Sequence, residues 1–245
     1  LRHACVIADL QERRKNIEAE IATVASAQGG KILPDAELVD IVNNLVEYPV
    51  PVAGKFDTAF LEVPDEVLIN SMREHQKYFA VVDSSNRLMP CFIAVNNTRA
   101  KDMNLVAKGH ERVLRARLSD ARFFYRADIE TPMDNWVEKL KGVLFQAKLG
   151  SIYEKIIRVR QLAEYIAESV NHDPNLKKHV SRAAYLCKAD LVSQVVGEFP
   201  KLQGVMGRIY AKAAGEPESV YLAIEEHYRP TYSGGALPET MTGAI

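Results

Sequence analysis

Cysteine is scarce in this sequence, and its three copies lie far apart. Cys5, Cys91 and Cys187 are odd in number, and no Cys-x-x-Cys spacing occurs among the 245 residues. An odd, dispersed set argues against a disulfide framework, and the missing pair spacing argues against a zinc knuckle. Free cysteines of this kind are typical of a reduced compartment, so we expect a cytoplasmic protein.

Long hydrophobic runs and an excess of charge are also missing. No apolar stretch approaches the roughly 20 residues that span a bilayer, and none precedes the first charged helix at about Asp9, so neither a transmembrane helix nor a signal peptide is predicted. The net charge is −1, so any RNA contact must come from a local basic patch. The first residue is Leu1, and Met241–Ile245 resembles the opening of a helix, so we expect an internal fragment of a longer protein.

Nucleotide-binding and metal-binding motifs are likewise absent from the sequence. The glycines form neither Gly-x-Gly-x-x-Gly nor a Walker loop, and the histidines show neither His-x-x-x-His nor His-Glu-x-x-His spacing. The sequence therefore predicts no phosphate cradle for ATP, no metal site and no cofactor in this stretch. We also predict no catalytic residue, because His75, a general base by type, has no acid or nucleophile beside it in the sequence.

The pattern of apolar residues divides the chain into an α+β front part and an all-helical back part. Two β-prone runs, Tyr78–Asp83 and Leu88–Asn96, are joined by polar residues, which predicts a hairpin. Apolar residues at helical spacing predict helices over residues 9–27, 35–47, 64–75, 104–125, 132–145, 152–170, 177–196, 205–214 and 218–227. We predict an α+β fold, mainly α overall, with an α+β region at 1–104 and a helical domain at 105–245.

One predicted helix carries a stripe of arginines on a single face. Its members are Arg112, Arg115, Arg122 and Arg126. The planar guanidinium group makes paired hydrogen bonds to phosphate, so the stripe is a candidate contact for a nucleic-acid backbone. The alternative is a solvated face on which the arginines pair with carboxylates. The carboxylates available for that pairing include Glu111, Asp120 and Asp128.

A second candidate surface lies at the corner between the third predicted helix and the hairpin. It consists of Arg73, His75, Gln76, Lys77 and Tyr78. A mixture of cation, imidazole, amide and aromatic ring suits RNA, where bases stack and phosphates pair. It equally suits a subunit interface, where arginine and tyrosine are enriched. A third interpretation is that these residues only fold the corner, and all three stay open.

Three longer stretches carry a family resemblance. Ser71–Val82, Asn96–Asp102 and Glu198–Gly207 are long and irregular, which makes a chance match a poor explanation. Together they resemble the β subunit of bacterial glycyl-tRNA synthetase, the heterotetrameric type. The resemblance runs from about Asp9 to Ile245, essentially the whole chain.

The resemblance implies that two kinds of subunit share the work. An α subunit similar to class II synthetases is expected to hold glycine, ATP and the adenylation chemistry, and the complete enzyme is expected to use Mg. The β subunit is expected to supply much of the recognition of tRNA(Gly) in an α2β2 complex. This stretch alone is therefore expected to be inactive. Two alternatives are an α–β assembly scaffold and an HD-type metal phosphohydrolase.

The resemblance also suggests what the two parts are. The front region resembles the end of the B3/B4 domain of phenylalanyl-tRNA synthetase, and the back part resembles a degenerate HD phosphohydrolase domain. An HD domain holds its metal with an adjacent His-Asp pair, but here Ala189 precedes Asp190. A single carboxylate is too little for a metal site, which disfavours the hydrolase. We expect Asp190 to cap a helix or to pair locally with Lys188 or Arg182.

Overall fold

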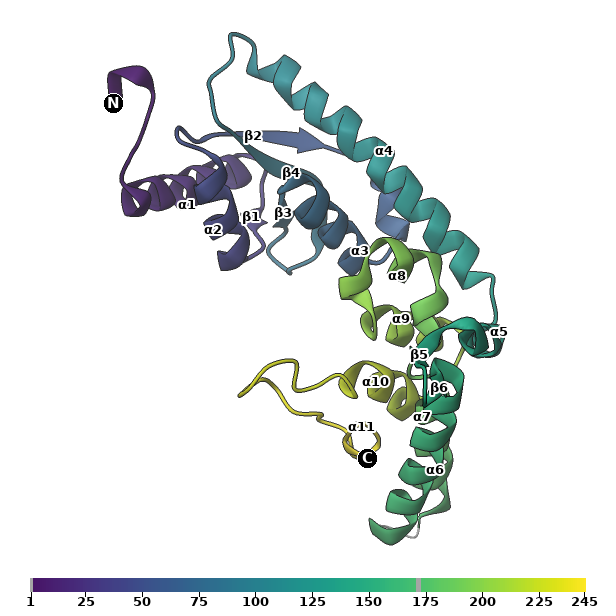
Figure 1. The fold of residues 1–245 in the computed structure, drawn as a ribbon. Helices are drawn as coiled ribbons and strands as arrows, with labels where there is room; N and C mark the ends of the chain where they lie inside the picture. The colour runs from purple at the N-terminus through teal and green to yellow at the C-terminus, as the bar shows by residue number, and fades with distance from the viewer. Residues whose placement is uncertain (1, 171–172) are drawn as a thin grey trace. The chain divides into compact units, whose positions relative to one another are not determined.

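The computed structural model describes residues 2–170 and 173–245 (Figure 1). The chain forms two compact units, Leu1–Phe123 and Phe124–Ile245. The boundary between the units falls after Phe123, inside helix α4 (Met103–Ile129). The sequence pattern places the domain boundary between residues 104 and 105, in the first turn of the same helix, and that division stays a prediction. The α+β class with mainly helical content is confirmed, and the likeness of the two parts to B3/B4 and HD domains stays a prediction.

The first unit contains a four-stranded antiparallel sheet in the order β1-β3-β4-β2. Its strands are β1 (Lys31–Ile32), β2 (Val50–Lys55), β3 (Phe79–Val82) and β4 (Leu88–Asn96). The predicted hairpin is confirmed, because β3 pairs with β4 and Phe79 lies opposite Ile93. β2 pairs with β4 and lies at the edge of the sheet, which is where Pro51 is tolerated, since proline has no N–H to donate to a further strand.

Helices precede, interrupt and follow the strands of this sheet along the chain. They are η1 (Arg2–Ala4), α1 (Leu10–Ala27), α2 (Ala36–Leu45), η2 (Thr58–Glu62), α3 (Asp65–Asn70), η3 (Ser71–Gln76) and the first part of α4. Helices α1 and α2 begin at aspartates whose carboxylates accept backbone N–H groups, which satisfies donors at the helix start. A core of buried residues joins α1 and α2 to β3 and β4. It contains Ile17, Ile21, Ala25, Leu38, Val39, Val42, Val46, Phe79, Val81, Cys91 and Ile93.

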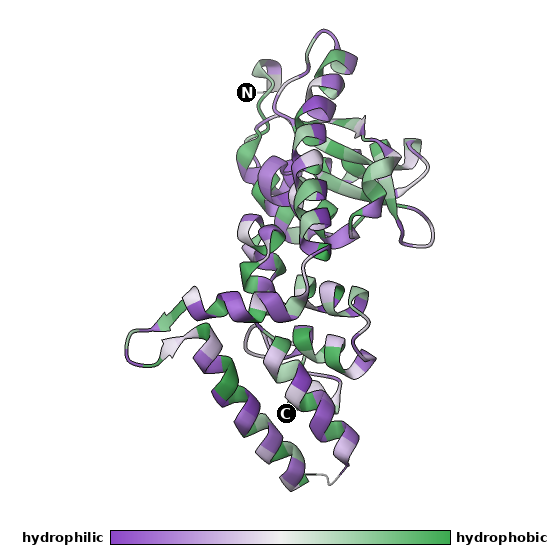
Figure 2. Cartoon of the chain, turned by 90° about the vertical axis from the view of Figure 1, so that its right-hand side faces the viewer, coloured by the Kyte–Doolittle hydropathy of each residue, from purple (hydrophilic) through white to green (hydrophobic). Residues whose placement is uncertain are grey.

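The second unit is built from short helices and one small hairpin. Its elements after α4 are α5 (Met133–Lys139), η4 (Leu140–Gly142), β5 (Leu144–Gln146), β6 (Gly150–Ser151), α6 (Ile152–Val170), α7 (Pro174–Leu186), η5 (Ala189–Val192), α8 (Gln194–Glu198), η6 (Pro200–Leu202), α9 (Val205–Ala213), α10 (Glu218–Glu226) and α11 (Met241–Ala244). Figure 2 shows hydrophilic and hydrophobic residues alternating along these helices, as expected where one face is buried. No helix among the described residues has both the length and the apolar sequence to cross a membrane.

Two predicted helices of this unit are wrong in extent. The helix predicted over 132–145 ends earlier, because residues 144–146 form β5 and pair with β6. The turn between these strands is closed by the Gln146 side chain, which accepts the N–H groups of Lys148 and Leu149. The helix predicted over 177–196 breaks after Leu186, and α8 starts afresh with Ser193 as its cap. Side-chain caps of this kind compete with continuation of a helix.

Candidate functional site

Arg73 is held inside the first unit by three carboxylates. Its Nε donates to Asp35 Oδ2 at 2.6 Å, and its other nitrogens bind Glu74 and Glu37. The side chain is 18% exposed. The hydrogen bond to Asp35 is the main cause that raises the pKa of Arg73 above its ordinary value. Asp35 also caps α2 by accepting the N–H of Leu38, so Arg73 ties the corner after α3 to the start of α2.

Tyr78 is buried in a network that links the hairpin to α4. Its hydroxyl lies 2.7 Å from Nδ1 of His110, and its ring stacks on Phe92 at 4.6 Å. Nε2 of His110 lies 2.9 Å from Asn96 Oδ1, while Asn96 Nδ2 donates to the carbonyl of Val50. These contacts assign the tautomer: the Nε2–H of His110 donates to Asn96, and Nδ1 accepts a hydrogen bond from the tyrosine O–H.

Burial perturbs both ionisable members of this network. It raises the pKa of Tyr78 to about 12 and lowers the pKa of His110. Both changes favour the neutral forms, which are the forms that the hydrogen bonds require. With 5% of its surface exposed, Tyr78 is not presented for stacking on a base. The sequence does not predict a role for His110, because its partners Tyr78 and Asn96 are 32 and 14 positions away along the chain.

The remaining residues of the corner lie at the end of η3, a π-helix. His75 and Gln76 are half-buried in its last turn. Lys77 follows in the left-handed region with φ 56°, and its Nζ donates to the carbonyl of Glu74 at 2.9 Å. The corner therefore folds tightly through Arg73, Lys77 and Tyr78. A contact of Arg73, His75, Gln76, Lys77 or Tyr78 with RNA or with another subunit stays a prediction.

The members of the arginine stripe differ in their surroundings. Arg122 lies 3.8 Å from Glu62 Oε1 and 4.8 Å from the centre of the Phe60 ring. Arg126 is exposed and lies in the second unit. Arg112 and Arg115 are exposed on α4, and within residues 2–170 and 173–245 neither makes an ion pair. The stripe thus leaves two guanidinium groups facing solvent in the first unit.

Two of the carboxylates considered as partners for the stripe are used elsewhere. Glu111 accepts the backbone N–H of Lys55 at 2.9 Å. Asp128 is buried and accepts the N–H groups of Gln194 and Val195 at the start of α8, as well as the hydroxyl of Tyr210 at 2.8 Å. Between residues 101 and 122 the sequence holds six basic and three acidic residues. The exposed part of α4 in the first unit is therefore a local basic surface on a nearly neutral chain.

Asp190 caps the start of α9 and explains why residues 204 and 207 of the Gly204–Gly207 motif are glycines. Its Oδ2 accepts the N–H of Gly204 at 2.6 Å and the N–H of Gly207 at 3.0 Å. Gly204 has φ +81°, and a Cβ there would lie 2.5 Å from the Tyr228 ring. A Cβ on Gly207 would lie 2.6 Å from Ile224 and 3.2 Å from Asp190 Oδ2. Both positions require glycine, because the carboxylate and its neighbours approach the backbone too closely for a side chain.

The expected helix cap at Asp190 is confirmed, and the expected pair with Arg182 is wrong. Arg182 instead binds Asp134 and Glu216. Lys188 places its Nζ 3.6 Å from the centre of the Tyr228 ring, and its charge contributes only a minor lowering to the pKa of Asp190. Burial is the dominant cause and raises the pKa of Asp190 to about 6, against the lowering by the two glycine N–H groups.

Two buried atoms near the end of α10 and at Asp190 make no hydrogen bond to described residues: Oδ1 of Asp190 and Nε2 of His227. Nδ1 of His227 donates to the carbonyl of Ile224 at 2.8 Å. Burial, followed by the charge of Lys188, lowers the pKa of His227 to about 4. In the part of the chain that the structure describes, no three metal-ligating side chains come together. Asp190 thus caps α9 through its other oxygen, and His227 binds the last turn of α10.

The chain is similar to one family of known proteins along its whole length. The family model described as "Glycyl-tRNA synthetase beta subunit" matches residues 1–245. Relatives named "Glycine--tRNA ligase beta subunit" include those of Desulforapulum autotrophicum, 61% identical over 100% of this chain, and Desulfatibacillum aliphaticivorans, 57% identical over 99%. The chain spans 36% and 35% of those two relatives, about a third of their length. The relative of Geotalea uraniireducens is 56% identical over 98% of this chain, which covers 35% of that protein.

Proposed function

This chain belongs to the glycyl-tRNA synthetase β-subunit family, and we propose that it is part of a glycine–tRNA ligase in which it binds tRNA(Gly) and assembles with an α subunit. In this proposal the adenylation site, with its ATP and Mg, lies on the α subunit of an α2β2 enzyme in the cytoplasm. The names of the relatives support the ligase and the existence of a second kind of subunit. They do not favour the scaffold or the phosphohydrolase.

One observation carries the tRNA-binding part of the proposal. Arg112 and Arg115 extend from α4 into solvent, and no described carboxylate pairs with either. A phosphate that binds such a group displaces only water and counterions, and no existing ion pair has to break. Arginine also makes paired hydrogen bonds to phosphate oxygens, which fixes the register of the nucleic acid.

The test is the salt dependence of tRNA binding. We expect the double variant Arg112→Gln, Arg115→Gln of the complete β subunit, assembled with its α subunit, to bind tRNA(Gly) more weakly at low salt. Its log–log slope against salt should fall by about one unit for each phosphate that the variant no longer binds. Exposed substitutions usually change stability by about 0.5 kcal/mol or less, so the melting temperature and α-subunit binding should be retained.

Arg117→Gln is the matched control. Arg117 is exposed on the same helix but lies off the stripe, so its removal should leave the slope nearly unchanged. An unaltered slope in a folded, assembled double variant would reject the RNA contact. Loss of α-subunit binding with the fold intact would instead assign this face to assembly.

A further inference from the structure

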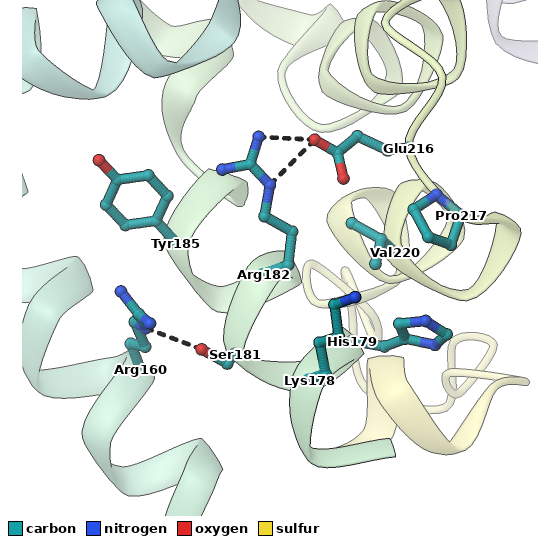
Figure 3. A pocket seen from close by; sticks show the side chains of 9 residues that line it. All are labelled: Arg160, Lys178, His179, Ser181, Arg182, Tyr185, Glu216, Pro217 and Val220. Atoms are coloured by element: carbon teal, nitrogen blue, oxygen red, sulfur yellow. Dashed lines mark hydrogen bonds and ion pairs between the residues drawn. The ribbon is translucent and has the colours of Figure 1, made fainter. Parts of the chain in front are cut away.

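The second unit contains a cavity of ligand size whose lining includes none of the RNA-binding or interface candidates predicted from the sequence. Its volume is about 440 Å³, and it lies among α6, α7 and the start of α10 (Figure 3). Binding sites for small molecules and cofactors usually fall between about 300 and 1,000 Å³. Its walls include the apolar side chains of Pro217 and Val220, the ring of Tyr185, and the cations Arg160, Lys178 and Arg182.

Arg182 builds the wall of this cavity and is not available to a ligand. Its Nη1 donates to Asp134 Oδ1 at 2.7 Å. Its Nη2 and Nε donate to Glu216 Oε1 at 2.6 Å and 2.9 Å (Figure 3). The hydrogen bond to Asp134 is the main cause that raises the pKa of Arg182. A ligand could take this guanidinium only by leaving two carboxylates unpaired.

Arg160 and Lys178 do have donors to spare. Nε of Arg160 is shared between Glu164 Oε1 at 2.9 Å and Ser181 Oγ at 2.8 Å. Its two terminal nitrogens make no hydrogen bond to any residue that the structure describes. Lys178 is exposed at the rim, and among residues 2–170 and 173–245 it has no ion pair. These donors therefore remain for an anionic group.

Lys178 is the lining cation that no described carboxylate pairs, so a ligand meets one unmatched positive charge there. Arg160 and Arg182 are paired, and the carboxylates Glu216, Asp134 and Glu164 balance the three lining cations in formal charge. A triphosphate would carry more negative charge than Lys178 and the free end of Arg160 can match. A phosphodiester carries a single charge. The guanidinium carbons of Arg160 and Arg182 lie 5.6 Å and 5.9 Å from the centre of the Tyr185 ring. The cavity wall therefore already contains contacts between an aromatic ring and guanidinium groups.

We propose that this cavity holds one unstacked nucleotide of the bound tRNA, with its phosphate at Lys178 and Arg160 and its base against Tyr185. Proteins recognise RNA in this manner where a base leaves the stack and meets aromatic rings or guanidinium planes. The inference rests on the proposed tRNA-binding function and adds a second contact, separate from the α4 surface.

The experiment measures the affinity of a tRNA(Gly) transcript for the assembled α and complete β subunits over a range of potassium chloride concentrations. Lys178→Gln should lower the log–log salt slope by about one. Tyr185→Leu should weaken binding about tenfold at every salt concentration, because it removes a stacking surface and no charge. Tyr185→Phe keeps the ring and should bind as the unmodified complex does.

Lys177→Gln is the matched control for charge, since Lys177 lies on the same helix and pairs with Glu168 outside the cavity. If Lys178→Gln and Tyr185→Leu bind normally while the Arg112, Arg115 double variant loses affinity, the cavity inference fails and the proposed function stands. If the unmodified complex binds no tRNA(Gly), both fail. Inhibition of tRNA binding by ATP alone, abolished by Lys178→Gln, would make the cavity a free-nucleotide site and overturn its assignment to RNA.

Discussion

Asp190 should make the second unit less stable as the pH rises from 4 to 7. Burial raises the pKa of this carboxyl to about 6, from an ordinary value of 3.8. The folded state therefore binds the proton more tightly than the unfolded state. The stabilisation from the protonated form is complete below about pH 3.8 and is lost as the pH rises through about 6. A difference of about two pKa units corresponds to about 3 kcal/mol, at 1.36 kcal/mol per unit.

The perturbation that isolates this effect is Asp190→Asn. Asparagine has nearly the same shape, its oxygen can accept the N–H groups of Gly204 and Gly207, and it does not titrate. The free energy of unfolding of the unmodified chain minus that of the variant should therefore fall by about 2–2.5 kcal/mol between pH 4 and pH 7, since the unfolded carboxyl is already partly ionised at pH 4. Taking the difference cancels the contribution of the other carboxylates to the pH dependence of stability. Several of them, such as Asp134 and Glu164, have lowered pKa values and therefore stabilise the fold more as the pH rises.

The assay is urea unfolding at several pH values, followed by the fluorescence of Trp136. This is the one tryptophan of the sequence, and it is buried in the second unit, so its signal reports the unit that contains Asp190. A difference that stays flat from pH 4 to 7, or that rises, would refute the reasoning. It would mean that the carboxyl is better solvated, or better paired, than its position at the start of α9 indicates.

Two further predictions concern close packing and buried hydrogen bonds. Gly207→Ala should lower the melting temperature of the second unit, because a Cβ there would lie 2.6 Å from Ile224. Gly197→Ala in α8 is the control and should be neutral or stabilising, since nothing lies within 4 Å of a Cβ at that position. Equal changes in melting temperature at the two sites would contradict this packing. Tyr78→Phe should cost about 1–2 kcal/mol in chemical unfolding, because it leaves Nδ1 of His110 without a donor. Unchanged stability with weaker tRNA binding would instead make the Tyr78 hydroxyl an RNA contact.

The elements that the sequence predicts well are those set by neighbouring residues. The β3–β4 hairpin follows from two β-prone runs around a short polar turn, and the long helices follow from apolar spacing. The helix break after Leu186 does not follow from neighbouring residues, because the apolar periodicity continues across it. After the break Ser193 caps α8, and Asp190 binds the N–H groups of Gly204 and Gly207, contacts well ahead in the chain that periodicity does not contain.

The candidate site shows the same limit more sharply. Arg73 is as basic and as suited to RNA as Arg112 when only neighbouring residues are considered. Its partners Asp35 and Glu37 precede it by 38 and 36 positions, so their pairing depends on the folded sheet and on the capped start of α2. Tyr78 likewise meets His110 across 32 positions. Residue type predicts which chemistry a side chain can perform, and only the fold shows whether its hydrogen bonds are already taken.

The basic residues of the chain therefore differ in what RNA binding would cost each one. A phosphate that captured Arg73 would have to replace charge-assisted hydrogen bonds to carboxylates, each contributing about 1.5–3 kcal/mol, and would leave those carboxylates repelling it. Arg182, held by Asp134 and Glu216, faces the same cost. Arg112, Arg115 and Lys178 do not, because they have only water and counterions to exchange. A nearly neutral chain can therefore bind an RNA backbone with few residues, provided that the fold leaves those few unpaired.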